Sequence, residues 1–250
     1  MRILLFVTFC FLSTSLFSQE NSKNMLGMSI GISVPINSFA KEICENYNST
    51  CAKNGMMLSF DDVYFITNNI GITAVAQFSQ NGLNADSIEN HIKHRVSNLL
   101  LNIDNGFIFQ DEDNSIANFG SWTQANLMLG SVFSLSLKSF FFDFRALAGL
   151  SVISCPDKDL SLDFLDGNFN SYEKIKNTPS IIYLLGSSVR YKLSSGYFVR
   201  LMVDWTYSKA TIEINDQIIN TKQVPEMNIR SDYEVSINLV YTGLSFAYNF

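Results

Sequence analysis

The sequence has few histidines, no excess of basic residues and no long apolar segment beyond its first 20 residues. Its 17 Lys and Arg residues are outnumbered by 23 Asp and Glu residues, which excludes a nucleic-acid-binding protein with a basic face. Phosphate-binding glycine loops are also missing, so no cofactor is expected. Hydrophobic residues, in contrast, make up 47% of the chain, which excludes an intrinsically disordered protein.

The 2 histidines do not form a recognisable catalytic or metal site. His91 and His94 lie near Glu89, but no further ligand has the spacing that a metal site requires. A barrel lipase or acylase would need a serine, a histidine and an acid at the rim of adjacent strands, and neither histidine falls on a predicted strand. We therefore predict no catalytic residue and no metal ligand. Three clusters of acidic residues are interpreted as solvated charge in loops or at the barrel rim, with divalent cation binding as the alternative. They are Asp61–Asp62, Asp111–Asp113 and Asp157–Asp159.

Residues 1–18 have the pattern of a secretory signal peptide. Arg2 precedes an apolar run, Ile3–Leu12, which is followed by small residues and is too short to span a bilayer as a helix. A lipoprotein would need a cysteine directly after a small-residue box, whereas Cys10 lies inside the apolar run. We predict cleavage after this segment, which leaves residues 19–250 as one exported domain.

Export makes disulfides chemically permissible for the remaining cysteines. Cys44 and Cys51 flank a short polar stretch, and this spacing predicts a disulfide that closes a small loop. Cys155 is then either unpaired or bonded to this loop, if the two loops meet. No two cysteines have the C-x-x-C spacing of a zinc or redox site.

The exported domain contains one long window without formal charge, Ala117–Leu137. Polar side chains such as Asn118, Gln124 and Asn126 interrupt this window, which argues against a lipid-facing helix. A closed β-barrel is the remaining way to cross a membrane with every backbone polar group satisfied.

Alternating sequence patterns indicate β-strands with one apolar face. Leu26–Val34 alternates apolar residues with glycine and serine, and Ile70–Ser79 repeats this contrast. In Phe140–Ser151 and Tyr197–Ser208 the charged residues of each segment fall together on one face. A membrane barrel turns its apolar face to lipid, whereas a secreted β-sandwich buries it, and periodicity alone does not separate the two.

The connections between the strands favour the barrel. Three connections are tight polar turns, Thr67–Asn69, Ser136–Ser139 and Ser194–Gly196, and they alternate with four long polar stretches. Seven connections imply eight strands with every long loop at one end, the asymmetry of outer-membrane barrels. The long stretches are Pro35–Gly55, Gln80–Gly120, Val152–Pro179 and Lys209–Ser231.

The second long stretch contains a predicted amphipathic helix. Ile88, Ile92 and Val96 begin an apolar stripe at helical spacing, between a capping Asp86 and a helix-breaking segment, Asp104–Gly106. We expect this helix to cover the barrel mouth, because exposed apolar stripes are rare. Lying on the outer leaflet and docking a partner are the alternatives.

The predicted inner face of the barrel contains several charges. An eight-stranded barrel has an interior just wide enough for its own side chains. We therefore interpret these charges as a luminal network that fills the barrel, and a general diffusion porin is disfavoured. The network comprises Asp143, Arg145, Arg190, Lys192, Arg200 and Asp204.

The last segment, Leu244–Phe250, is an alternating aromatic strand that ends in phenylalanine. It resembles the strand by which bacterial outer-membrane barrels are recognised and inserted, a role that the resemblance assigns to Phe246, Tyr248 and Phe250. With Gly27–Pro35, the chain is similar by pattern to the small eight-stranded outer-membrane β-barrel family of Gram-negative bacteria. The resemblance implies an all-β, antiparallel up-and-down transmembrane barrel with long extracellular loops, located in the outer membrane.

The sequence thus predicts a non-enzymatic outer-membrane barrel that acts structurally or through its surface loops. The expected partners are outer-membrane lipid, the barrel-assembly machinery and an unidentified surface ligand or envelope protein. Two alternatives are a barrel enzyme acting on lipid or peptide, and an accessory subunit of an envelope assembly or secretion complex.

Overall fold

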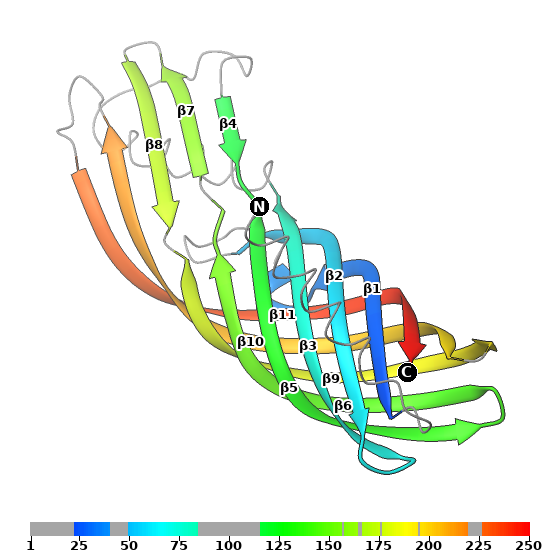
Figure 1. Ribbon diagram of the computed structural model, residues 1–250. Coiled ribbons are helices and arrows are strands. Elements are labelled where there is room, and N and C mark those ends of the chain that lie inside the picture. The colour runs from blue at the N-terminus through cyan, green and yellow to red at the C-terminus, as the bar shows by residue number, and fades with distance from the viewer. Residues whose placement is uncertain are drawn as a thin grey trace, which may run out of the picture.

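The computed structural model describes residues 23–40, 50–84, 116–156, 158–164, 167–175, 177–194, 196–219 and 227–250. These residues form antiparallel β-strands and one short 3-10 helix, η1 (Asn37–Ala40) (Figure 1). No helix in this part of the chain is long and apolar enough to cross a membrane.

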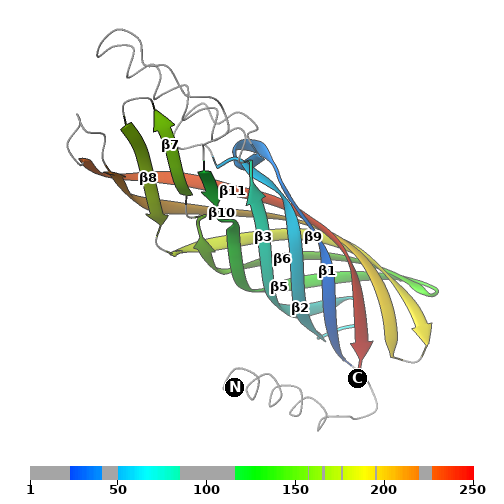
Figure 2. The same ribbon diagram turned by 90° about the horizontal axis from the view of Figure 1, so that it is seen from above.

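Eight strands close into a barrel, as predicted. They pair in the order β11-β1-β2-β3-β5-β6-β9-β10, and β10 pairs with β11 to complete the ring (Figure 2). The closed ring satisfies the backbone hydrogen bonds internally, which hydrocarbon requires. The strands are β1 (Asn24–Pro35), β2 (Ala52–Phe65), β3 (Ile70–Leu83), β5 (Trp122–Leu137), β6 (Phe140–Ser154), β9 (Thr178–Ser194), β10 (Tyr197–Ile219) and β11 (Met227–Asn249).

Burial alternates along the barrel strands with a period of two residues. On β6, Asp143 and Arg145 are buried inside the barrel, whereas Phe142 and Phe144 are exposed outside it. The outer surface therefore has the large apolar side chains, and the inner surface is rich in serines, amides and charges. A secreted β-sandwich has the opposite distribution, so that alternative is excluded.

The three predicted tight turns are present at one end of the barrel. They join β2 to β3, β5 to β6 and β9 to β10, and Lys138 and Gly196 adopt positive φ angles of 55° and 88° in two of them. At the same end, the Phe250 N–H donates to the Asn24 carbonyl oxygen at 2.9 Å. Short turns lie on the periplasmic side of outer-membrane barrels, which defines the orientation of this one.

The end of the barrel opposite the tight turns contains more β-strand than the sequence predicts. β10 and β11 continue far into the stretch Lys209–Ser231, which the sequence predicts as a loop. The stretch Val152–Pro179 contains two further strands, β7 (Lys158–Phe164) and β8 (Gly167–Ile175), and β4 (Ile116–Phe119) precedes β5. β8 pairs with the outer part of β10, β7 with β8 and β4 with β7, so a sheet extends beyond the barrel (Figure 1).

Candidate functional site

The barrel lumen holds three buried ion pairs between described residues. In one of them, Arg200 on β10 binds Asp61 on β2, with Nη1 at 2.9 Å from Oδ2. The Nη2 atom of Arg200 also donates to Ser29 Oγ on β1, at 3.2 Å, and to Ser245 Oγ on β11, at 3.0 Å. This guanidinium therefore links four strands and lies across the seam where β1 meets β11.

The other two ion pairs involve β6. Arg145 binds Asp204 on β10 through two nitrogens, with Nε at 3.1 Å from Oδ1. Arg190 on β9 binds Asp143, with Nη2 at 2.8 Å from Oδ1, and the same nitrogen donates to Ser134 Oγ at 3.1 Å. Bidentate geometry makes such charge-assisted pairs strong and fixes the orientation of both side chains.

Two glycines leave room for two of these ion pairs. Gly186 on β9 lies beside Arg145–Asp204, and Gly27 on β1 lies beside Arg200–Asp61. A Cβ atom at Gly186 would lie 1.9 Å from Asp204 Oδ1 and 3.1 Å from Arg145 Cγ. A Cβ atom at Gly27 would lie 2.9 Å from Asp61 Oδ1. The distances to Asp204 Oδ1 and Asp61 Oδ1 are shorter than carbon and oxygen tolerate, so a side chain at either glycine would displace the paired carboxylate.

An apolar layer lies inside the barrel at the turn end. The Arg190 guanidinium lies above three rings, at 5.6 Å from the centroid of Phe65, 5.1 Å from Phe141 and 5.4 Å from Phe198. These cation–π contacts join the charged layer to the apolar one. The remaining members of the apolar layer are Met25, Val63, Val132 and Ala247.

A hydrogen-bonded layer crosses the lumen on the other side of the ion pairs. The Tyr241 hydroxyl on β11 lies 3.0 Å from Ser79 Oγ on β3 and donates to Gln124 Oε1 on β5 at 3.3 Å. Ser33 Oγ donates to Asn81 Oδ1 at 2.9 Å. Tyr241 is fully buried, so its ring occupies the lumen rather than lining the rim.

A second apolar layer lies towards the extracellular end. η1 places Phe39 against Trp122, with ring centroids 5.4 Å apart in an edge-on arrangement. Trp122 Nε1 donates to the Thr50 carbonyl oxygen at 3.0 Å. A cavity of about 10 Å³ remains beside these rings, which is room for about one water molecule.

One inner row of side chains retains hydrogen-bonding capacity. Ser59, Gln77, Asn126 and Ser151 are register partners on four consecutive strands of the barrel. In each of them one buried polar atom has no partner among the described protein atoms. Such atoms are sites for bound water.

Two sequence interpretations of charged residues need correction. Lys192 was assigned to the luminal network, but it is exposed, because β9 has reached the turn end at this position. Asp61 was assigned to solvated rim charge, but it is buried and paired with Arg200. Its neighbour Asp62 is exposed on the outer face of β2. The alternation itself could have identified Asp61, because this residue is in phase with the inward Ser59.

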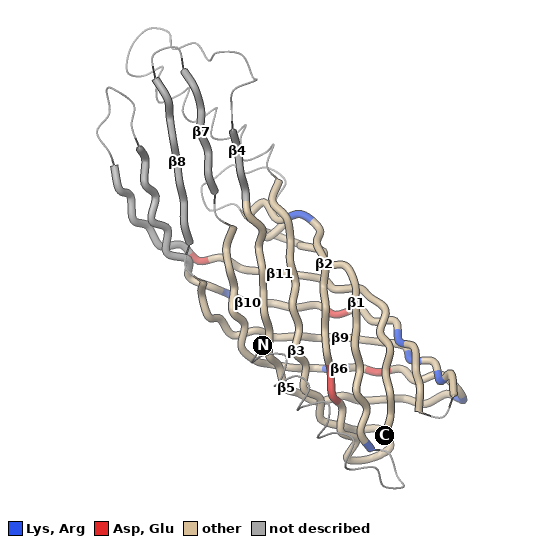
Figure 3. Tube along the Cα trace, turned by 45° about the horizontal axis from the view of Figure 1, so that its top comes forward, with Lys and Arg blue, Asp and Glu red and all other residues tan. Residues whose placement is uncertain are grey.

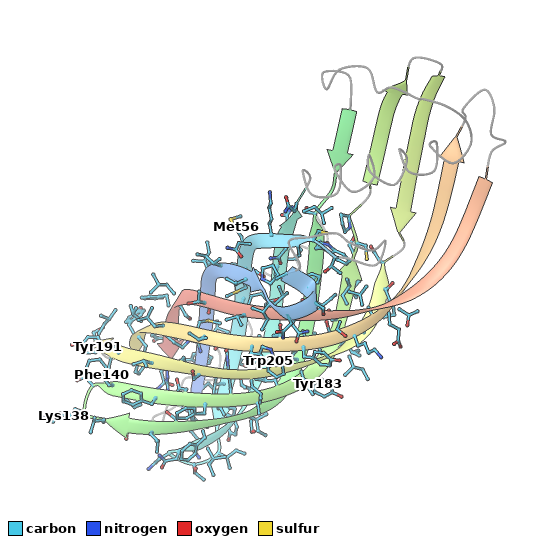
Figure 4. All side chains as sticks on the ribbon, turned by 180° about the vertical axis from the view of Figure 1, so that it is seen from behind. Met56, Lys138, Phe140, Tyr183, Tyr191 and Trp205 are labelled. Carbon is cyan, nitrogen blue, oxygen red and sulfur yellow. The ribbon has the colours of Figure 1, made fainter. Side chains whose placement is uncertain are left out.

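Phe246 and Tyr248 lie on the outer face of β11, and Phe250 directly follows this strand. Tyr197 on β10 packs against Phe246 and Tyr248, with centroids 5.7 Å and 4.9 Å apart, and Tyr248 stacks on Phe250 at 6.2 Å. Their role as an insertion signal stays a prediction. Phe140 and Tyr191, 5.0 Å apart, lie at the same end of the barrel (Figure 4).

Several sequence predictions fall outside the described residues. These are the signal peptide, the helix of the second long stretch with His91 and His94, Cys44, and the acidic residues Asp111–Asp113 and Asp157. The predicted pairing of Cys44 with Cys51 therefore stays a prediction, although Cys51 is buried. Cys155 is a buried thiol. Among the described side chains, no group of three or more His, Cys, Asp or Glu residues could hold a metal ion.

The outer surface of the barrel is an apolar band between aromatic side chains. Tyr197 lies near the turn end of β10, and Trp205 and Tyr207 stack further along the strand. Tyr197 and Tyr207 are ten positions apart, which at about 3.4 Å per residue and a tilt of about 45° corresponds to a height of roughly 24 Å, as in transmembrane barrels. Formal charges are sparse along the barrel (Figure 3).

No protein-family model and no curated protein matches the chain. Three solved structures to which it is similar are outer-membrane proteins. OprG from Pseudomonas aeruginosa is 12% identical, with 92% of this chain and 98% of that chain covered and a TM-score of 0.47. Neisserial surface protein A is 8% identical, covering 93% and 100%, with a TM-score of 0.44. A major outer membrane protein from Thermus thermophilus is 10% identical, covering 90% and 99%, with a TM-score of 0.46.

The class of the protein follows from its own surface. A closed ring with apolar side chains outside and polar side chains inside suits hydrocarbon around it, not water. The chain is a small eight-stranded β-barrel of the outer membrane.

Proposed function

We propose that this barrel is non-enzymatic, that its lumen is closed to solutes, and that its sheet extension mediates interactions outside the membrane. The observation that supports a closed lumen is the filling of the interior by the buried pairs Arg200–Asp61 and Arg145–Asp204. Each pair joins strands that are not neighbours in the ring and lies inside the barrel over the strands between them, so its side chains occupy part of the lumen. Apolar layers on either side, at Phe141 and at Phe39, add two further barriers to ions.

Conductance measurements test the closed lumen. We expect no conductance steps when the purified protein is incorporated into planar lipid bilayers. A double variant, Arg145→Ala with Asp204→Ala, removes one luminal pair without leaving a buried charge unpaired, and we expect brief openings. A stable channel in the unsubstituted protein, with the same conductance as the double variant, would contradict the proposal.

The sheet extension supports a role in binding outside the membrane. Its strands β4, β7 and β8 continue the sheet from the outer part of β10, whereas the ring closes without them. An extension that the barrel does not need for closure is suited to present a surface to a partner. We expect that deletion of residues 158–175 leaves the barrel inserted but removes the envelope proteins that copurify with the full chain. Identical copurifying proteins from both chains would contradict this role.

A further inference from the structure

A groove crosses the outer surface of the barrel on β2, β3, β5 and β6. Its volume is about 370 Å³, within the range of about 300–1,000 Å³ for small-molecule sites. Its floor consists of Ala76 and Ala125, which lie on adjacent strands in adjacent register rows. Phe60, Phe78 and Leu127 form walls, because the small alanine side chains leave a diagonal depression between these larger ones.

The position of the groove determines what fills it. Phe78 and Leu127 are exposed side chains of the apolar outer band, so the groove opens to the membrane. Water is excluded from this region, and the occupant must be a hydrocarbon chain or an apolar surface of another protein. The groove lies on the half of β3 that leads to the extracellular end, so it faces the outer leaflet.

The upper end of the groove is polar. The next outward row above Phe78 and Ala125 contains Gln80 and Thr123. Gln80 Nε2 donates to the Oγ atom of the half-buried Ser121 at 2.7 Å, which links β3 to the residue before β5 above the groove. These side chains place the upper end of the groove at the level of lipid headgroups.

A cation lies above this polar row. Lys53 is exposed on β2, three positions before Met56, which Figure 4 labels at the upper part of the strand. Among the described residues Lys53 has no ion-pair partner, whereas Lys209 at the same end pairs with Glu234 at 2.6 Å. An anionic headgroup near Lys53 would provide the missing counter-charge.

We propose that this groove binds an acyl chain of an anionic lipid of the outer leaflet, with the headgroup near Lys53. The alanine floor accepts the chain, Gln80 and Ser121 donate or accept hydrogen bonds at the glycerol or sugar level, and Lys53 selects negative charge. A second copy of the barrel would need a ridge that matches the shape of the groove, and Lys53 would not favour its binding. The occupant is therefore a lipid.

Native mass spectrometry of the full chain from an uncharged detergent tests this site. The probes are phosphatidylglycerol and phosphatidylcholine with identical acyl chains. We expect one retained phosphatidylglycerol per barrel, in excess over phosphatidylcholine by about fivefold, the factor expected for one lysine near an anionic lipid headgroup. Ala125→Phe fills the groove and should abolish retention of both lipids. Lys53→Gln should remove the excess and leave equal retention of the two.

Matched variants separate these outcomes from misfolding. Ala146→Phe places the same ring on an exposed outward alanine of β6 that does not line the groove, and should retain lipid normally. Ala76→Leu is a smaller filling variant, for use if Ala125→Phe does not insert. Retention unchanged by both filling variants, or an excess unchanged by Lys53→Gln, would overturn the proposal. Loss of a barrel dimer rather than of lipid would identify the groove as an interface between copies.

Discussion

At the scale of single residues, Asp61 and Asp62 are adjacent carboxylates with opposite environments. Asp61 points into the lumen and binds Arg200, whereas Asp62 points outward. Alternation along a strand separates neighbours in the sequence by the full thickness of the barrel wall. Grouping the two as one acidic pair was the error of the sequence interpretation, and assignment by phase corrects it.

We expect the two carboxylates to respond oppositely to substitution. Asp61→Asn leaves the Arg200 charge buried without its partner and should lower the free energy of unfolding by about 3–5 kcal/mol. Asp62→Leu replaces a charge on the lipid-facing surface and should raise that free energy by up to about 1 kcal/mol. Urea unfolding of the protein in lipid vesicles measures both values. Equal effects of the two substitutions would contradict the assigned faces.

The glycine beside the second ion pair gives another prediction. Gly186→Ala places a methyl group where Asp204 Oδ1 lies and should displace the carboxylate from Arg145. We expect a loss of about 1–3 kcal/mol in the free energy of unfolding, the usual result of forcing an extra carbon into a packed interior. Gly82→Ala is the control, because no atom lies within 4 Å of its added Cβ. A neutral Gly186→Ala variant would show that the pair tolerates rearrangement.

At the scale of elements, the sequence predicted the membrane-spanning strands better than their continuations. Leu26–Val34 and Phe140–Ser151 were identified because lipid requires an apolar outer face at every second position. Beyond the membrane no lipid requires an apolar side chain at every second position, so the alternating pattern ends. The sequence therefore predicts a loop for the outer part of β10, from Lys209, where the structure has a strand. The strands β7 and β8 were missed for the same reason.

The barrel and its extension should respond differently to disruption. Deletion of residues 158–175 removes β7 and β8, and we expect the remaining barrel to migrate compactly on gels until it is boiled. Leu244→Pro should abolish this compact form, because Leu244 pairs with both Ile30 and Leu201 and proline removes a donor from the ladder. A compact form that needs β7 and β8 would place them in the folding core.

At the scale of the whole molecule, the distribution of polarity defines the protein. The alternating pattern fitted both a barrel and a sandwich, and the short turns favoured the barrel. The luminal partners could not be assigned in the same way, because Arg200 and Asp61 are 139 positions apart in the sequence. Only the closure of β1 on β11 brings them together.

The two tryptophans lie on opposite faces of the barrel wall, so their fluorescence can test which face contacts lipid. Trp205 is on the outer face at 37% exposure, and Trp122 is inside at 5%. In vesicles of lipids with brominated acyl chains, we expect strong fluorescence quenching of the Trp122→Phe variant, in which Trp205 remains. The Trp205→Phe variant should be quenched weakly, because the barrel wall shields Trp122. Equal quenching of the two variants would contradict a barrel surrounded by lipid.

The hydrogen bond between Phe250 and Asn24 has a consequence for the connectivity of the ring. The two positions are neighbours in space, and each barrel strand already has a partner on both sides. The strand pairing of the closed ring therefore does not require any particular strand to come first in the sequence. A circularly permuted gene that joins residue 250 to residue 24 through a short linker and opens at the Lys138 turn would encode the same set of strand pairings.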